Sequence, residues 1–178
     1  MDAGKARQAT PCRQCSLRSV KFVVAAVGHR MPAWIQAGFH EYARRMPRDA
    51  QLVIREIKPA ARGKDSGAMA IKRLLQTERE RIDAALPPDS YKVALDERGV
   101  GLSTRQLAER IARWREIGRD VTFIIGGADG MAAALKDEAD LLWSISPLTL
   151  PHGLVRIVLA EQLYRAMSIL SGHPYHRE

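Results

Sequence analysis

Residues that could do chemistry follow three short apolar segments, each of which is predicted to be a β-strand. Segment 91–95 (YKVAL) is followed by Asp96, and segment 121–125 (VTFII) runs into the glycine-rich sequence GGADG. Segment 142–145 (LWSI) leads into the loop SPLTLPHG at 146–153. Open α/β sheets bind ligands beyond the carboxyl ends of their strands, so these three strand ends are the candidate ligand site.

The two loops differ in what they suit. A glycine pair such as Gly126–Gly127 allows a ligand to approach the backbone, although GGADG on its own favours a plain turn between strand and helix. A dinucleotide fingerprint is disfavoured, because G-x-G-x-x-G spacing after a first strand is absent. SPLTLPHG combines stiff, apolar residues with backbone amides and carbonyls, which suits an adenine or a methionine side chain. From composition alone, a buried crossover loop is an equally good reading.

The end of the chain gathers polar rings and cations. Three of the five histidines lie in the last 27 residues, and His176 stands between Tyr175 and Arg177. These side chains suit stacking on a base and contact with phosphate. The alternative is a frayed chain end. Because the segment contains Pro174 and has little apolar surface, we expect it to position RNA and not to support the fold.

Cys12 and Cys15 form a C-x-x-C pair near the beginning of the chain. A structural zinc site needs four ligands, and no second Cys or His pair lies at a finger-like distance. A redox C-x-x-C normally opens a helix after a strand, whereas this one follows Pro11 in a polar stretch. We therefore interpret the pair as incidental, and we predict no metal site.

The predicted elements alternate between strands and helices. Strands are expected at 21–27, 51–57, 91–95, 121–125 and 142–145, and helices at 32–46, 68–85, 103–118, around 131–139 and 154–170. Ser103 and Gln106 form a capping box, and the sequence ERGVG at 97–101 reads as a turn. The pattern predicts a single α/β domain with a mainly parallel sheet flanked by helices over residues 20–178. Residues 1–19 read as a disordered or misannotated extension.

Composition narrows the choice of partner. The 178 residues carry a net charge of +8, of which the first 19 residues hold +3. Such a basic balance favours nucleic acid, although a basic protein without a polymer partner has the same composition. No apolar run approaches the length of a membrane span, and the first residues lack the apolar core of a secretory signal. We expect a cytoplasmic protein.

Taken together and in this order, several motifs resemble the RlmH family, the SPOUT-class methyltransferases of pseudouridine N3 in 23S rRNA. The matching stretches cover about residues 20–178 and include VAAVGHRMPAWIQAGFHEYARRMPRD, IKPAARGKD, VALDERG, IIGGADG, SISPLTLPHGLVRIVLAEQLYRA and HPYHRE. The resemblance implies an α/β fold with a C-terminal trefoil (SPOUT) knot, a homodimer, S-adenosylmethionine (SAM) as cofactor and 23S rRNA, within the ribosome, as partner.

The resemblance also implies two sets of site residues. The set expected to line the SAM pocket is Leu95, Gly126, Gly127, Ser146, Pro147, Leu148, Thr149, Leu150 and Pro151. The set expected to face the RNA is His152, Arg165, Tyr175, His176 and Arg177. We hypothesise that His152 is the base that removes the N3 proton, and that Arg165 or Arg177 stabilises the developing negative charge.

Three other functions compete with this interpretation. A SAM-dependent knotted enzyme that methylates tRNA is disfavoured by the HPYHRE terminus. A non-catalytic rRNA-binding assembly factor is disfavoured by the intact cofactor loop. A SAM titration discriminates such a factor from a methyltransferase. A Rossmann-type dehydrogenase is disfavoured because the first strand lacks the required glycines.

Overall fold

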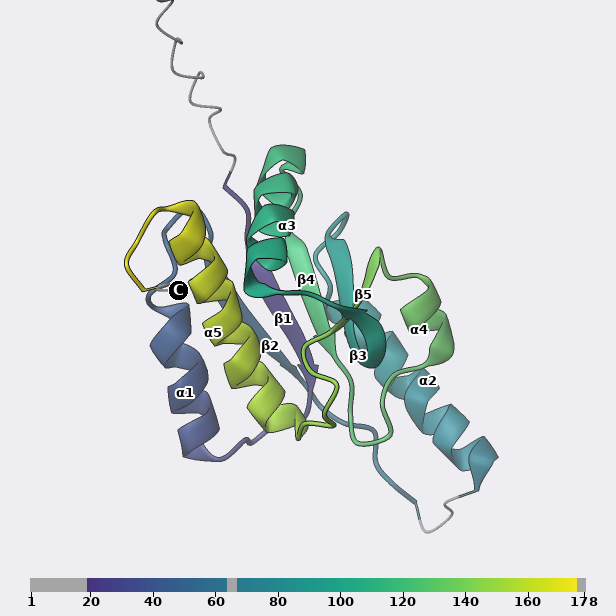
Figure 1. Cartoon of the computed structure of the whole chain (residues 1–178). Coiled ribbons are helices and arrows are strands. Elements are labelled where there is room, and N and C mark those ends of the chain that lie inside the picture. Colours follow the sequence, from purple (N-terminus) through teal and green to yellow (C-terminus); the bar gives the residue numbers. More distant parts are fainter. Residues whose placement is uncertain (1–18, 64–66, 176–178) are drawn as a thin grey trace, which may run out of the picture.

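The computed structural model describes residues 19–63 and 67–175, which form one five-stranded sheet with helices on both faces (Figure 1). All paired strands are parallel, in the order β2-β1-β4-β3-β5. The strands are β1 (Phe22–Val27), β2 (Leu52–Ile57), β3 (Tyr91–Gly101), β4 (Val121–Ile125) and β5 (Leu141–Ser144). The helices are α1 (Ala33–Ala43), α2 (Ala68–Ala85), α3 (Thr104–Ile117), α4 (Ala133–Asp137) and α5 (His152–Leu170).

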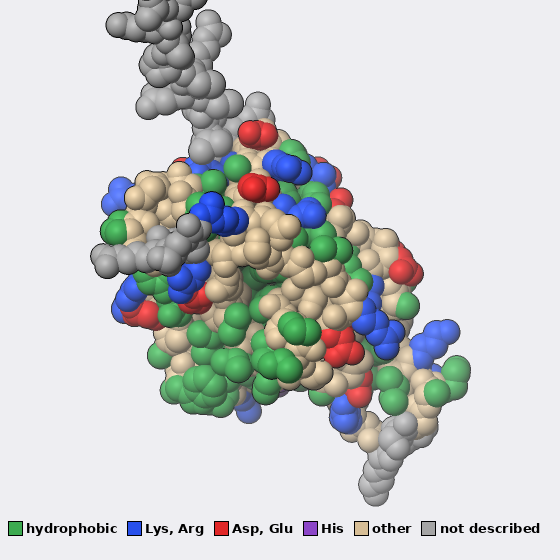
Figure 2. Space-filling model, in the orientation of Figure 1, with side chains coloured by type: hydrophobic (Ala, Val, Ile, Leu, Met, Phe, Trp, Pro, Cys, Tyr) green, Lys and Arg blue, Asp and Glu red, His purple; other side chains and the backbone are tan. Residues whose placement is uncertain are grey.

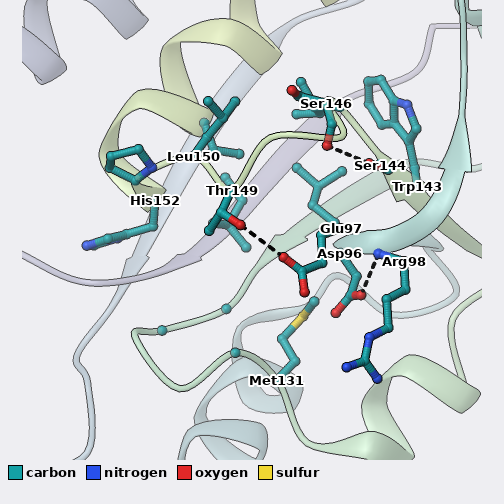
Figure 3. A pocket seen from close by; sticks show the side chains of 18 of the residues that line it. Asp96, Glu97, Arg98, Met131, Trp143, Ser144, Ser146, Thr149, Leu150 and His152 are labelled. Atoms are coloured by element: carbon teal, nitrogen blue, oxygen red, sulfur yellow. Dashed lines mark hydrogen bonds between the residues drawn. The ribbon is translucent and has the colours of Figure 1, made fainter.

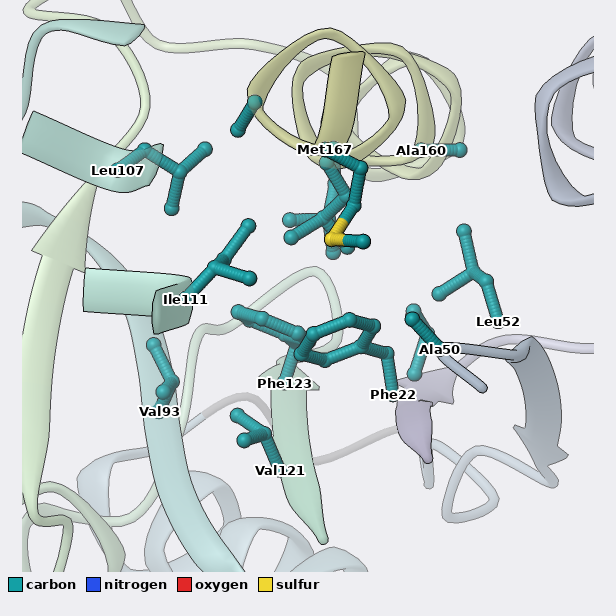
Figure 4. Packing of buried hydrophobic residues seen from close by; sticks show 14 of the residues in the cluster. Phe22, Ala50, Leu52, Val93, Leu107, Ile111, Val121, Phe123, Ala160 and Met167 are labelled. Atoms are coloured by element: carbon teal, nitrogen blue, oxygen red, sulfur yellow. The ribbon is translucent and has the colours of Figure 1, made fainter. Parts of the chain in front are cut away.

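The central strands β1 and β4 are apolar because helices cover the sheet on both faces, whereas β2 at the edge of the sheet has exposed residues. Helices α1, α3 and α5 cover one face, and α2 and α4 cover the other. On the first face, Phe22 and Phe123 pack beneath Met167 of α5 (Figure 4). On the second face, Val27 and Ile124 belong to a smaller cluster with residues of α2 and α4. Helix α5 lies between α1 and α3, so its position is fixed from three sides.

The structure confirms the parallel α/β domain, and the capping box of Ser103 and Gln106 is present at the start of α3. Helix α5 begins at His152, two residues earlier than predicted. The trefoil knot stays a prediction. None of the helices in the described part of the chain is long and apolar enough to cross a membrane. The predicted extension 1–19, including Cys12 and Cys15, lies outside the described residues except for Ser19.

The predicted turn at ERGVG is wrong, because β3 continues through these residues to Gly101. The ladder between β3 and β5 shifts its register, so that both Leu95 and Val100 pair with Trp143. Gly99 permits this arrangement, since a Cβ atom there would lie 2.6 Å from the backbone of Trp143. The irregularity leaves residues 96–99 out of the regular ladder at the carboxyl end of the strand pair.

Candidate cofactor pocket and substrate site

A cavity of about 580 Å³ lies where β3, β4 and β5 end, and the irregularity in β3 forms part of its wall (Figure 3). That volume is in the range of small-molecule binding sites. Eight of the nine residues predicted to bind the cofactor line it, namely Leu95, Gly126, Gly127, Ser146, Leu148, Thr149, Leu150 and Pro151. Pro147 belongs to the same loop but is not part of the lining. The structure therefore brings the three predicted strand ends together.

The wall from β3 carries three charged side chains: Asp96, which the sequence analysis placed at this strand end, and Glu97 and Arg98, which it did not assign to the site. Asp96 forms an ion pair with Lys136 of α4, and its Oδ1 accepts a hydrogen bond from the backbone N–H of Arg98 at 3.0 Å. Partial burial raises the pKa of the Asp96 carboxyl, but Lys136 and this N–H outweigh that effect and hold the pKa below its ordinary value. Asp96 is therefore a carboxylate whose charge is compensated within the wall.

The glycine pair serves the geometry of the turn. A Cβ atom on Gly126 would lie 2.5 Å from the carbonyl oxygen of Gly130, and one on Gly127 would lie 2.9 Å from the buried carboxylate of Glu78. The N–H of Gly127 donates to Gly130 O at 3.2 Å, so it is engaged within the turn. The glycines thus shape this wall by close packing, and the N–H of Gly127 is used within the turn.

The loop Ser146–Pro151 is held by its own side chains. Ser144 Oγ donates to the Ser146 carbonyl at 2.9 Å, and the Leu148 N–H donates to Ser146 Oγ at 2.9 Å. The N–H groups of Thr149 and Leu150 enter no backbone hydrogen bond within the described residues. Both residues line the cavity, so these amides are candidates to hold a polar edge of a ligand.

His152 is the first residue of α5 and stands at the rim of the cavity (Figure 3). Its ring lies against Gly28, where a Cβ atom would be 2.9 Å from the His152 Cε1 atom. Gly28 has a φ of +120°, a conformation that side chains rarely adopt, so glycine is required there twice over. His152 Nδ1 is buried without a hydrogen-bond partner among the described residues, which leaves Nε2 as the nitrogen for a substrate proton.

Arg156, one turn after His152, is a functional candidate that the sequence analysis missed. It is 1% exposed. Its Nη1 donates to Glu56 Oε1 at 2.8 Å and its Nη2 to Gly28 O at 2.8 Å. It thereby fixes the helix that carries His152 to the ends of β1 and β2. The available sequence signal was a basic residue, four positions after His152, on an otherwise apolar stretch of helix.

Arg165 and Tyr175 lie together, but not at the cavity. Glu161 Oε1 accepts hydrogen bonds from Arg165 Nε at 2.8 Å and from Tyr175 Oη at 3.3 Å. The Tyr175 ring meets the ring of Tyr164 at a centroid distance of 4.8 Å. Arg165 follows His152 by 13 residues on the same helix, which corresponds to about 20 Å at 1.5 Å per residue. His176 and Arg177 lie outside the described residues.

Burial dominates the electrostatics of Tyr175. Together with a hydrogen bond to Tyr42 and the negative charge of Glu161, burial raises the pKa of its phenol to about 12. The hydrogen bonds from Arg165 to Glu161 raise the pKa of that guanidinium, so Arg165 stays charged. Among the described residues, no group of three or more His, Cys, Asp or Glu side chains is arranged to hold a metal ion.

The chain matches known proteins along most of its length. The family profile described as Predicted SPOUT methyltransferase matches residues 20–176. Proteins named Ribosomal RNA large subunit methyltransferase H, from Burkholderia mallei (strain SAVP1) and Burkholderia pseudomallei (strain K96243), are each 54% identical over 158 residues, covering 89% of this chain and 99% of theirs. A solved structure of a methylase family protein from Neisseria gonorrhoeae aligns over 96% of this chain and 91% of its own, with 15% identity and a TM-score of 0.48. The profile and the two relatives show that the chain belongs to the SPOUT methyltransferases and, among them, to the RlmH family.

Proposed function

We propose that this protein uses SAM to methylate N3 of a pseudouridine in the 23S rRNA of the large ribosomal subunit. Membership of the RlmH family and the names of the relatives support a methyltransferase of large-subunit rRNA. The observation that carries the cofactor assignment is that eight of the nine residues expected to bind SAM line the same cavity. Because the proposed substrate is ribosomal RNA, we infer that the enzyme acts in the cytoplasm.

The lining of the cavity fits SAM chemically. Leu95, Ile125 and Leu150 offer apolar surface for an adenine ring, and the amides of Thr149 and Leu150 are suited to its polar edge. The Glu97 carboxylate, which pairs with no cation among the described residues, gives the cavity an anionic group that suits a cationic ligand. When bound, SAM supplies an electrophilic methyl group.

The chain's own residues supply positioning and proton transfer in the proposed reaction. The N3–H of the base must lose its proton as the N3–methyl bond forms, and His152 Nε2 is suited to accept that proton. Buried Arg156 and the close contact with Gly28 restrict the His152 ring to the rim of the cavity. A guanidinium from Arg165 or Arg177 would stabilise the negative charge that develops on the base.

The two ends of α5 support the proposal of a homodimer. His152 and Arg165 are about 20 Å apart on a rigid helix, so one chain does not bring them to the same base. A second copy could present its Arg165 and Tyr175 to this cavity. Exposed apolar residues at the beginning of α1 and α5, and in the cofactor loop, offer a contact surface: Trp34 is 60% exposed, Leu154 36% and Leu148 71%. Figure 2 shows a continuous hydrophobic area over this end of the two helices.

A basic segment at the beginning of α2 is suited to hold RNA near the cavity. Lys72 and Arg73 are exposed on α2, Lys58 and Arg62 lie in the preceding loop, and the described residues of 58–73 include no acid. Arg62 Nη2 pairs with Asp129 of the cavity lining at 2.5 Å. This ion pair holds the loop at the carboxyl ends of the strands, where the cavity lies. Phosphate contacts from such residues would position the substrate without reading its sequence.

Mass spectrometry of rRNA nucleosides from a strain lacking this protein tests the proposal. We expect the loss of one methyl group from one pseudouridine of 23S rRNA, with recovery when the gene is restored. A parallel SAM titration of the purified protein tests the cofactor. An unchanged set of methylated nucleosides, or loss of a methyl group from tRNA instead, would contradict the proposed substrate.

A further inference from the structure

Three carboxylates line the cavity, and they differ in how their charge is compensated. Asp96 pairs with Lys136, and Asp129 pairs with Arg62. Glu97 has a neutral partner, because its Oε2 accepts a hydrogen bond from Thr149 Oγ1 at 3.2 Å and it forms no ion pair within the described residues. Figure 3 shows the Asp96 side chain between those of Glu97 and Arg98. Glu97 is therefore the uncompensated negative charge of the wall.

The hydrogen bond also gives Glu97 a defined place. Thr149 belongs to the loop that forms one part of the cavity wall, and Glu97 belongs to the irregular part of β3 that forms another. The hydrogen bond joins these two parts of the wall directly. A ligand in the cavity would therefore lie near the Glu97 carboxylate.

The proposed reaction changes the charge of the cofactor. Methyl transfer breaks the bond between sulfur and methyl and forms one between N3 and methyl, while N3 releases its proton. The electron pair of the broken bond stays on sulfur, so a positively charged sulfonium becomes a neutral thioether. S-adenosylhomocysteine (SAH), the product, therefore has one positive charge fewer than SAM. A nearby carboxylate attracts the first form more strongly than the second.

We propose that Glu97 makes the pocket prefer SAM over SAH by charge, and that its hydrogen bond to Thr149 separately fastens the cofactor loop. This inference rests on the proposed SAM-dependent function. Glu97 attracts SAM before transfer and attracts the cofactor less strongly once the sulfonium charge is gone, which favours exchange of the product. The hydrogen bond contributes equally to both forms, because it depends only on closing the loop.

Two substitutions separate the effect of the Glu97 charge from the effect of its hydrogen bond to Thr149. Glu97→Gln removes the charge and keeps an oxygen that accepts the Thr149 hydroxyl. Thr149→Val keeps the charge and the branched shape but removes the hydrogen bond. Glu109→Gln, at an exposed acid of α3 outside the cavity lining, is the matched control. Calorimetric titrations of the full-length protein and each variant with SAM and with SAH give the ratio of the two dissociation constants.

We expect Glu97→Gln to reduce the preference for SAM over SAH by about fivefold, the effect of one partly solvated charge at short range. Thr149→Val should weaken SAM and SAH by the same factor, and Glu109→Gln should change neither. High salt should narrow the difference between wild type and Glu97→Gln. Thermal melting checks that all variants fold.

The outcomes are distinguishable. An unchanged SAM-to-SAH ratio in Glu97→Gln would overturn the inference and leave the proposed function intact. If Glu97→Gln and Thr149→Val each weaken the binding of SAM and SAH equally, Glu97 acts only through its hydrogen bond to the loop. That result would also overturn the inference. If the wild-type protein binds neither SAM nor SAH, the proposed function fails, and this inference fails with it.

Discussion

The guanidinium of Arg156 donates a hydrogen bond to the carbonyl oxygen of Gly28, at 2.8 Å, inside the protein. The contact joins the first turns of α5 to the end of β1 and passes directly beneath His152. Glu56 completes the arrangement with an ion pair to the same guanidinium. A charge buried in this way is stabilised only while its partners remain in place.

Replacing Arg156 with Met should destabilise the protein by about 3 kcal/mol, because the Glu56 carboxylate and the Gly28 carbonyl would lose their shared partner. Urea denaturation of the purified variant measures the change. Arg44→Met, at an exposed residue of similar size, is the control and should change stability by less than about 0.5 kcal/mol. Equal stabilities of the two variants would show that the Arg156 contacts contribute nothing net.

The Tyr175 ring should contribute about 1 kcal/mol to stability, because it packs against the Tyr164 ring. Tyr175→Ala should therefore lower the melting temperature slightly, whereas deletion of residues 176–178 should leave it unchanged. Both changes should reduce methyl transfer by orders of magnitude while SAM affinity stays at its wild-type value. Loss of SAM binding in either variant would assign the tail to the cofactor pocket instead.

The raised pKa of Tyr175 makes a pH-dependent prediction. Its folded-state pKa of about 12 exceeds the ordinary value of 10.0, so the contribution of the neutral phenol to stability is complete below pH 10 and is lost as the pH rises toward 12. Ultraviolet titration of the tyrosinates should show a late transition that is absent in Tyr175→Phe. If Tyr175→Phe removes an early transition instead, the phenol is not protected.

The salt dependence of RNA binding tests the beginning of α2. The double variant Lys72→Ala/Arg73→Ala should reduce the slope of log affinity against log salt by about 1 to 2, because phosphate contacts release counterions. The variant Lys21→Ala/Arg113→Ala removes the same charge from exposed residues toward the amino ends of the strands and serves as the control. Equal slopes in the two variants would mean that only the net charge of the protein matters.

Trp34 should lie within the interface if the proposed homodimer uses the apolar surface of α1 and α5. Trp34→Glu should then halve the mass measured by light scattering, because burying a carboxylate in an apolar contact is unfavourable. Ile117→Glu, at a 51% exposed residue near the end of α3, should leave the mass unchanged. A Trp34→Glu protein with undiminished mass would move the interface elsewhere.

Sequence patterns predicted the elements better than the contacts between them. Short apolar runs indicated all five strands, most clearly β1 and β4, because strands buried on both faces are almost wholly apolar. The continuation of β3 through ERGVG was missed, because its cause is the close approach of Gly99 to the backbone of Trp143, a residue far away in the sequence. The roles of Glu97 and Arg156 were missed for the same reason, since their partners come from other elements.

The length of α5 has a genetic consequence. His152 and Arg165 occupy opposite halves of a single rigid helix. A chain with a substitution at one of these positions therefore keeps the other side chain in place. If two copies share each site as proposed, a mixed dimer of His152→Ala and Arg165→Ala chains contains one site with both side chains intact. Co-expression of two inactive alleles should then restore part of the rRNA methylation that neither allele supports alone. Complementation between alleles of one gene would thus report the architecture of the site from within the cell.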